Sequence, residues 1–254
     1  VAWNWYIETA GTGSSNTDGT INTTSTLVDT NLGLSISKYT GTGANATIGH
    51  GLGVAPTFVI IKRLTGSGYN PPVAINSGDL NFSKRANLDG LGVFTADATF
   101  FQDTNPSSSV ITLGINGNVN GSSVPHICYA FAPSQFISIG TYVANGNANG
   151  AFIPTINSLG IPIQPAWVMI RGVDIARSWY INDDKRNGNG NPIEKYLVAN
   201  ATNADADDTS PNDFVTGGIK VRGTGTGNGN PGSTYAYIAF GTPIIDVDGR
   251  IITG

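Results

Sequence analysis

The chain has 254 residues, a formal net charge of −4 and only 12% charged residues. This balance offers no basic surface for nucleic acid or anionic lipid, and the single cysteine, Cys128, excludes an intramolecular disulfide framework. The 34 glycines and 13 prolines, with many Asn, Thr and Ser residues, indicate an all-β protein with many turns. No apolar run approaches the roughly 20 residues that span a bilayer, so we expect no membrane insertion.

Residues 1–33 are predicted to form an N-terminal lead-in or connector. Trp3 and Trp5 alternate with polar residues, as on a short strand with one apolar face. A polar tract with an Asp18-Gly19 turn signal follows. We expect the two tryptophans to be buried, either against the domain that follows or against a neighbouring subunit.

From residue 34 onward, a series of predicted strands recurs. Residues 34–39 and 137–142 alternate apolar and polar side chains with a period of two, which indicates half-buried strands. Residues 58–62 (FVIIK) and 167–171 (WVMIR) are short apolar runs entered through a proline, typical of strands buried on both faces. The offset grows from 137 − 34 = 103 to 167 − 58 = 109, so the second copy carries a net six-residue insertion.

Further matched segments continue in the same order along both copies. The pairs are 73–76 with 179–182, 110–113 with 219–221, and 126–131 with 235–240. The Asn/Gly-rich segments 116–122 and 223–232 are predicted as hairpin loops. A short helix is considered for residues 192–199.

Six segments that recur in order predict an internal duplication. The expected fold is all-β, with two tandem β-sandwich, jelly-roll-like repeats of about 100 residues each. We place the first repeat at 34–135, the second at 136–245 and a C-terminal tail at 246–254. The copies could instead interleave into one larger sandwich.

Three side chains carry catalytic chemistry, but their settings favour structural roles. His50 lies in a glycine-rich turn (GHGLG), where local hydrogen bonding is the expected use. Cys128 and His126 share one face of a predicted strand, so a nucleophile pair is conceivable. The second copy has Tyr237 at the place of Cys128, which favours packing. We therefore expect no catalytic residues.

Two acidic segments and one glycine-rich run have compositions that also occur in ligand-binding loops. Residues 205–213 and 246–249 are rich in Asp, which suits Ca²⁺, but neither has the spacing of an EF-hand. Solvated turns are the expected structures there. Residues 223–229 (GTGTGNG) lack the Lys and Ser/Thr of a phosphate-binding loop. We expect neither a metal nor a cofactor.

Aromatic residues beside predicted loops give the candidate ligand site. Trp179, Tyr180 and Tyr196 are its expected members, and Tyr69 is a fourth candidate in the first copy. Such side chains stack on sugar rings in lectin-like sandwiches, although they also occur as ordinary core residues.

Several motifs resemble a known family, the Gly/Asn/Thr-rich β domains of tail-fibre and other virion structural proteins of marine bacteriophages, cyanophages in particular. The resembling segments are 1–5 (VAWNW), 15–19 (SNTDG), 39–56, 165–171 and 235–240. Within them, residues 49–56 (GHGLGVAP) are fairly specific. The resemblance implies a location in the virion, on the particle surface, and it implies no catalytic residues.

We therefore expect a non-enzymatic virion protein, a tail-fibre or appendage domain that binds host-surface glycan. The alternative is a capsid-decorating or connector module without a ligand. Expected partners are further copies of the chain, with a trimer favoured, and other virion proteins. A glycan-degrading enzyme would need two carboxylates in one cleft, and the sequence pairs none.

Overall fold

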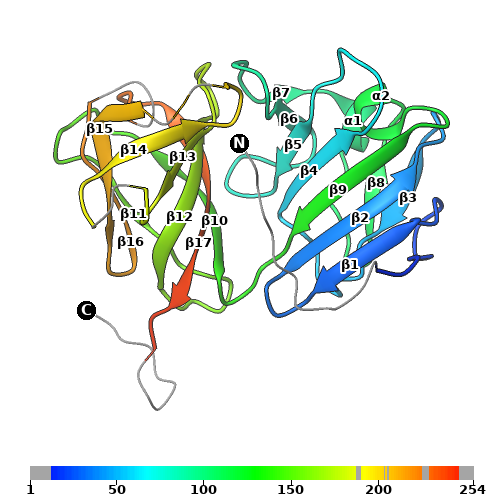
Figure 1. Cartoon of the computed structure of the whole chain (residues 1–254), viewed down its shortest axis with the longest axis horizontal. Coiled ribbons are helices and arrows are strands. Elements are labelled where there is room, and N and C mark those ends of the chain that lie inside the picture. The colour runs from blue at the N-terminus through cyan, green and yellow to red at the C-terminus, as the bar shows by residue number, and fades with distance from the viewer. Residues whose placement is uncertain (1–12, 187–189, 203, 205, 225–228, 246–254) are drawn as a thin grey trace. The chain divides into compact units, whose positions relative to one another are not determined.

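The computed structural model describes residues 13–186, 190–202, 204, 206–224 and 229–245 (Figure 1). The chain divides into two compact units. The first holds Val1–Gly90 and Phe94–Pro133, and the second holds Leu91–Val93 and Ser134–Gly254. Both are built from antiparallel sheets, so the predicted all-β class is confirmed. Trp3, Trp5 and the expected tail lie outside the described residues.

The first unit has one large sheet and one small sheet. Its strands are β1 (Ser25–Asp29), β2 (Leu34–Thr40), β3 (Ala46–Gly49), β4 (Phe58–Arg63), β5 (Pro72–Ile75), β6 (Lys84–Asn87), β7 (Thr95–Ala96), β8 (Val110–Leu113) and β9 (Pro125–Phe131). Over the described residues the large sheet has the order β1-β2-β9-β4-β5-β6-β7, and β3 pairs with β8 in the small one. Strand β1 comes from the expected lead-in and pairs with β2 over its whole length.

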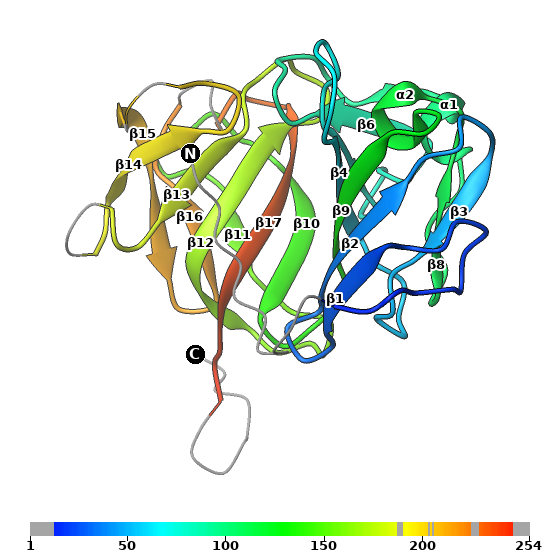
Figure 2. The ribbon, with the colours of Figure 1, turned by 45° about the vertical axis from the view of Figure 1, so that its right-hand side comes forward.

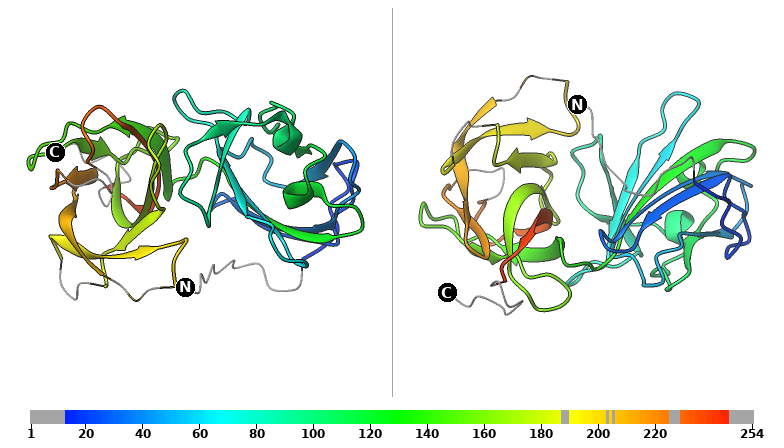
Figure 3. Two further views of the ribbon diagram at one scale, coloured as in Figure 1. Left: turned by 90° about the horizontal axis from the view of Figure 1, so that it is seen from above. Right: turned by 60° about the horizontal axis from the view of Figure 1, so that its bottom comes forward.

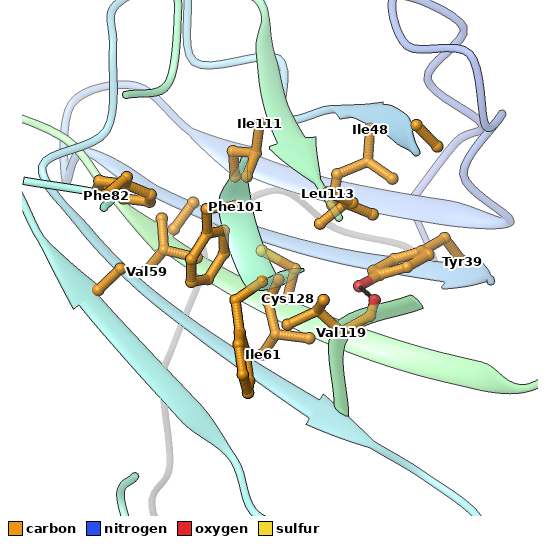
Figure 4. Close-up of a cluster of buried hydrophobic side chains, with 14 of the residues drawn as sticks. Tyr39, Ile48, Val59, Ile61, Phe82, Phe101, Ile111, Leu113, Val119 and Cys128 are labelled. Atoms are coloured by element: carbon orange, nitrogen blue, oxygen red, sulfur yellow. Dashed lines mark hydrogen bonds between the residues drawn. The ribbon is translucent and has the colours of Figure 1, made fainter. Parts of the chain in front are cut away.

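Two short helices and the small sheet cover one face of the large sheet. The helices are α1 (Ala98–Phe101) and α2 (Gly117–Asn120). Figure 3 shows these helical turns on one side of the curved large sheet. In Figure 4, Val59, Ile61 and Cys128 of the large sheet face residues such as Phe101 and Ile111. Each fully buried aliphatic or aromatic side chain of this kind contributes about 1.5–3 kcal/mol.

The second unit has a single large sheet that curls toward a barrel (Figure 2). Its strands are β10 (Ile137–Val143), β11 (Phe152–Pro154), β12 (Ile163–Gly172), β13 (Tyr180–Asp183), β14 (Ile193–Val198), β15 (Ala206–Val215), β16 (Gly218–Val221) and β17 (Thr234–Pro243). Across the described chain their order is β10-β17-β12-β13-β14-β15-β16-β11. The Tyr237 hydroxyl, on β17, donates to the carbonyl of Pro154 at 3.1 Å, which links the second strand of this order to β11, the last one.

Part of this sheet repeats the pairing of the first unit. The order β2-β9-β4-β5 matches β10-β17-β12-β13 strand for strand. The registers agree as well: Leu34 pairs with Phe131 and Phe58 with Phe131, as Ile137 and Trp167 both pair with Phe240. The internal duplication itself stays a prediction, and this shared pairing supports it.

The shared pairing extends to side-chain contacts. Tyr39 and His126, on β2 and β9, stack with ring centroids 5.2 Å apart and an interplanar angle of 12°. Tyr142 and Tyr235 occupy the corresponding register in the second unit and stack at 5.4 Å and 16°. Equivalent positions therefore hold equivalent ring pairs although three of the four residues are tyrosine and one is histidine.

Four local predictions are wrong. Within 192–199, residues Ile193–Val198 form strand β14, which pairs with β13 and β15, and no helix. The acidic segment 205–213 falls largely in β15 and is not a turn, because Ala206 and Asp207 pair with β14 and Asn212 and Asp213 pair with β16. The segment 116–122 is no hairpin, since β8 pairs with β3 while β9 pairs with β2 and β4, and α2 lies between them. The segment 223–232 is no hairpin either, since β16 pairs with β11 and β15 while β17 pairs with β10 and β12.

Candidate functional site

His50 is a structural residue of the first unit. Its ring is buried, Nδ1 accepts from the Leu52 amide at 3.2 Å, and Nε2 donates to the Ser107 carbonyl at 3.2 Å. Burial lowers the pKa of this ring, the largest of several effects on it. A neutral imidazole with both nitrogens bonded to the backbone joins two loops and is not placed to act as a general base.

His126 and Cys128 lie on β9 and are both buried. His126 Nδ1 bonds to the Val124 carbonyl at 2.9 Å, and burial lowers the pKa of the ring. Cys128 belongs to the apolar core, where burial raises the pKa of its thiol. A thiol held protonated among aliphatic side chains is a core residue and not a nucleophile.

The strongest candidate for ligand binding lies on the inner face of the second unit's sheet. Tyr180 pairs directly with Ile170, and Ile170 belongs to the core cluster of this unit, so both side chains point to the same inner face. Tyr196, on β14, lies diagonally across from Tyr180. Their ring centroids are 5.2 Å apart with an interplanar angle of 49°, and both residues are half-buried. Two of the three predicted site residues are thus brought together.

Two buried amides complete this arrangement. Asn182 follows Tyr180 on the same inner face, and its Oδ1 accepts from Asn212 Nδ2 at 3.1 Å. Asn182 Nδ2 donates to the carbonyl of Lys195 at 3.0 Å, which fixes the amide orientation. We call Tyr180, Tyr196, Asn182 and Asn212 the tyrosine–amide site.

The amides were not predicted from the sequence, because their significance depends on the sheet register. Val168 pairs with Asn182, as Val59 pairs with Ala74 in the first unit. Ala74 belongs to the apolar core there. The second unit therefore places a polar side chain where the first has a methyl group, and a buried polar group is costly unless it is bonded. The sequence match instead aligns Ala74 with Tyr180, which lies two positions before its structural counterpart Asn182.

Trp179, the third predicted member, does not lie on this face. It is fully buried, and the guanidinium carbon of Arg171 lies 5.1 Å from its ring centroid. Arg171 also donates to the carbonyl of Gly92, which belongs to the same unit. Because Trp179 exposes no ring surface, a sugar cannot stack on it in this conformation.

Two ion pairs lie where β13 ends, beside the tyrosine–amide site. Asp183 Oδ2, at the end of β13, forms an ion pair of 3.0 Å with Arg186, and Asp184 pairs with Lys185 at 2.9 Å. Among the described residues no group of three or more His, Cys, Asp or Glu side chains could hold a metal ion. Asp205, Asp246 and Asp248 lie outside those residues, while Asp213 is buried and paired with Arg222. The site offers half-buried tyrosine rings and hydroxyls over a pair of bonded amides, an arrangement that suits a neutral polar ligand.

The fold and the site together define an all-β protein of two units, the second of which carries a tyrosine–amide site on a curled sheet. The chain belongs to the family described as Domain of unknown function (DUF7483), whose model matches residues 1–243. Comparisons with curated proteins and with solved structures gave no match. No helix in the described part of the chain is long and apolar enough to cross a membrane.

Proposed function

We propose that this chain is a non-catalytic carbohydrate-binding domain of a phage tail fibre or appendage, which holds host-surface glycan at the tyrosine–amide site. The observation that carries the proposal is the Tyr180–Tyr196 pair, because half-buried tyrosine rings present apolar faces beside polar hydroxyls. A pyranose ring offers the complementary pattern of C–H faces and hydroxyls.

The buried amides support this ligand class. Asn182 is bonded to Asn212 and to the backbone carbonyl of Lys195, so the floor of the site is held in place before a ligand arrives. A preorganised site loses less conformational entropy on binding. The paired charges of Asp183 with Arg186 and of Asp184 with Lys185 favour a neutral saccharide over an ionic one.

The virion location rests on the sequence resemblance, in particular on residues 49–56 (GHGLGVAP). In that setting the chain assembles with copies of itself, as a trimer, and with other virion proteins. Symmetric assembly multiplies a weak glycan contact, since linked sites bind with an avidity that exceeds each single affinity.

A glycan array tests the proposal with the intact chain and a Tyr180→Ala/Tyr196→Ala double variant. The wild-type chain is expected to bind a defined set of neutral glycans. The double variant should lose at least about tenfold in affinity, equal to about 1.4 kcal/mol, because two stacking surfaces are removed.

Phe152→Ala is the matched control. Phe152 is an aromatic residue of the same unit, 51% exposed, and it lies on the outer face of β11 because its neighbour Ile153 joins the core. This variant should bind as the wild type does, and circular dichroism should show all variants folded. If the wild-type chain ignores both the array and host envelope polysaccharides, the carbohydrate proposal fails.

A second candidate function is a capsid-decorating or connector module without a ligand. It is favoured by exposed apolar side chains around the β11–β12 connection, namely Phe152 (51%), Ile156 (47%) and Leu159 (66%). Such side chains suit a protein partner. Cryo-electron microscopy of the particle separates the candidates, since density on the capsid shell supports the decorating role and density at a fibre tip supports the adhesin.

A further inference from the structure

A second exposed aromatic side chain lies in the first unit, on the connection between β4 and β5. Tyr69 is 44% exposed. The guanidinium carbon of Arg63, the last residue of β4, lies 3.6 Å from its ring centroid. A guanidinium at this distance is held by the ring quadrupole, and it covers one face of the tyrosine. The opposite face is the part of the ring left for a ligand.

The Arg63–Tyr69 stack is held by the backbone around it. Arg63 Nε donates to the carbonyl of Thr65 at 2.8 Å, and Nη1 donates to the carbonyl of Gly117 at 3.3 Å. Glycines occupy both edges of the ring. A Cβ at Gly117 would lie 3.2 Å from Tyr69 Cε1, and one at Gly66 would lie 3.4 Å from Cε2. Both edges thus lack side chains that would crowd the stack.

Arg63 has one guanidinium nitrogen, Nη2, that can still donate a hydrogen bond to a ligand. Within the described part of the chain, no carboxylate forms an ion pair with Arg63. Its Nη2 atom makes no hydrogen bond to the described residues, and it is not one of their buried unbonded atoms. It therefore reaches solvent. A guanidinium recognises planar carboxylates through its N–H groups, so this positive charge is available to an anionic group beside the Tyr69 ring.

Asparagine residues lie beside the Arg63–Tyr69 stack. The backbone amide of Asn70 donates to Asn118 Oδ1 at 2.9 Å, and Asn118 Nδ2 donates to Asn116 Oδ1 at 2.9 Å. These bonds tie the β4–β5 connection to α2 and fix the position of Tyr69. Asn70 is itself exposed, so its side-chain amide is a partner for saccharide hydroxyls.

We propose that Arg63 and Tyr69 form a second binding site, specific for an acidic saccharide, whose carboxylate accepts from Arg63 Nη2 while its pyranose ring stacks on the open face of Tyr69. The inference rests on the proposed function for the class of ligand, but it uses other residues in the other unit. A single guanidinium on a chain of net charge −4 does not suit nucleic acid.

Isothermal titration of the intact chain with oligogalacturonate tests the site. Tyr69→Ala should weaken binding by at least about tenfold, the equivalent of one lost stacking surface. Tyr69→Phe keeps the ring and should retain binding. Arg63→Gln removes the charge and should abolish the preference for oligogalacturonate over its carboxyl-reduced, neutral form, a ratio that a general loss of stability does not change.

The same titration with variants of the tyrosine–amide site separates this inference from the proposed function. The Tyr180→Ala/Tyr196→Ala double variant should bind oligogalacturonate as the wild type does. The second site is refuted if Tyr69→Ala binds as tightly as the wild type, if the neutral form binds equally well, or if the wild type binds no oligogalacturonate. None of these results bears on neutral glycan binding in the second unit, which the glycan array tests separately. Equal binding of polyglutamate would refute the saccharide specificity and assign the surface to an acidic peptide.

Discussion

At the scale of single residues, the same aromatic chemistry serves two purposes that the sequence does not distinguish. Trp179 and Tyr180 are neighbours in the chain, yet Trp179 is buried and Tyr180 is half-buried, because successive side chains of a strand point to opposite faces. The sequence could identify both as candidates, but assigning each to a face needs the register of β12 and β13.

This difference predicts opposite phenotypes for two adjacent substitutions. Trp179→Ala should destabilise the protein by about 3–5 kcal/mol, because it leaves a large cavity in a buried place. Tyr180→Ala should have a much smaller effect on stability and should reduce glycan binding. Urea unfolding followed by circular dichroism gives both free energies, and equal destabilisation by the two substitutions would contradict the assignment of faces.

At the scale of elements, period-two alternation and short apolar runs located the strands of the shared pairing pattern, as for β2, β4, β10 and β12. Glu194, Lys195 and Leu197 favour a helix locally, which is why the sequence suggests one at 192–199. The helix prediction is wrong because pairing with β13 and β15 overrides this local preference. Partners this distant in sequence leave no local signal. The sequence match of β5 with β13 was two residues out for the same reason, since Val73 pairs with Ile60 as Ile181 pairs with Met169.

Short elements of the first unit depend on one buried amide. Asn120, at the end of α2, is fully buried. Its Oδ1 accepts from the Thr42 amide at 2.7 Å, and its Nδ2 donates to the carbonyls of Ala44 at 2.6 Å and Gly114 at 3.1 Å. One side chain thereby joins α2 to the β2–β3 connection and to the end of β8.

Asn120→Ala is therefore expected to destabilise the first unit by about 2–3 kcal/mol, since it removes three hydrogen bonds and leaves the carbonyl of the buried Gly114 without this partner. Asn149→Ala is the matched control, because Asn149 is exposed in the second unit. Chemical denaturation measures both variants. A loss below about 0.5 kcal/mol for Asn120→Ala, the range of ordinary surface substitutions, would show that the amide does not hold these elements.

At the scale of the whole molecule, the two units differ in their ionisable residues. The chain has two histidines, and both His50 and His126 belong to the first unit. Burial lowers the pKa of each. The unfolded chain therefore binds more protons than the folded chain once the pH falls below the unfolded histidine pKa of about 6.5.

It follows that the stability of the first unit is complete above about pH 6.5 and decreases as the pH falls toward the folded pKa values, by at most about 1.4 kcal/mol per pH unit for each histidine. The second unit lacks this dependence. Urea unfolding at pH 7.5 and pH 5.5, followed by NMR signals from each unit, measures the difference. Equal losses in the two units, or no loss in the first, would contradict the prediction.

The common register of the two sheets has a consequence for folding. While both units are still forming, β17 can compete with β9 for the gap between β2 and β4, because the backbone pairing is the same. Such exchange is a known route to misfolding in tandem domains. Tyr237 would then replace Cys128 in the packed core of the first unit, and overpacking of this kind is unfavourable. The difference between the side chains on the two inner faces thus disfavours pairing with the wrong strand.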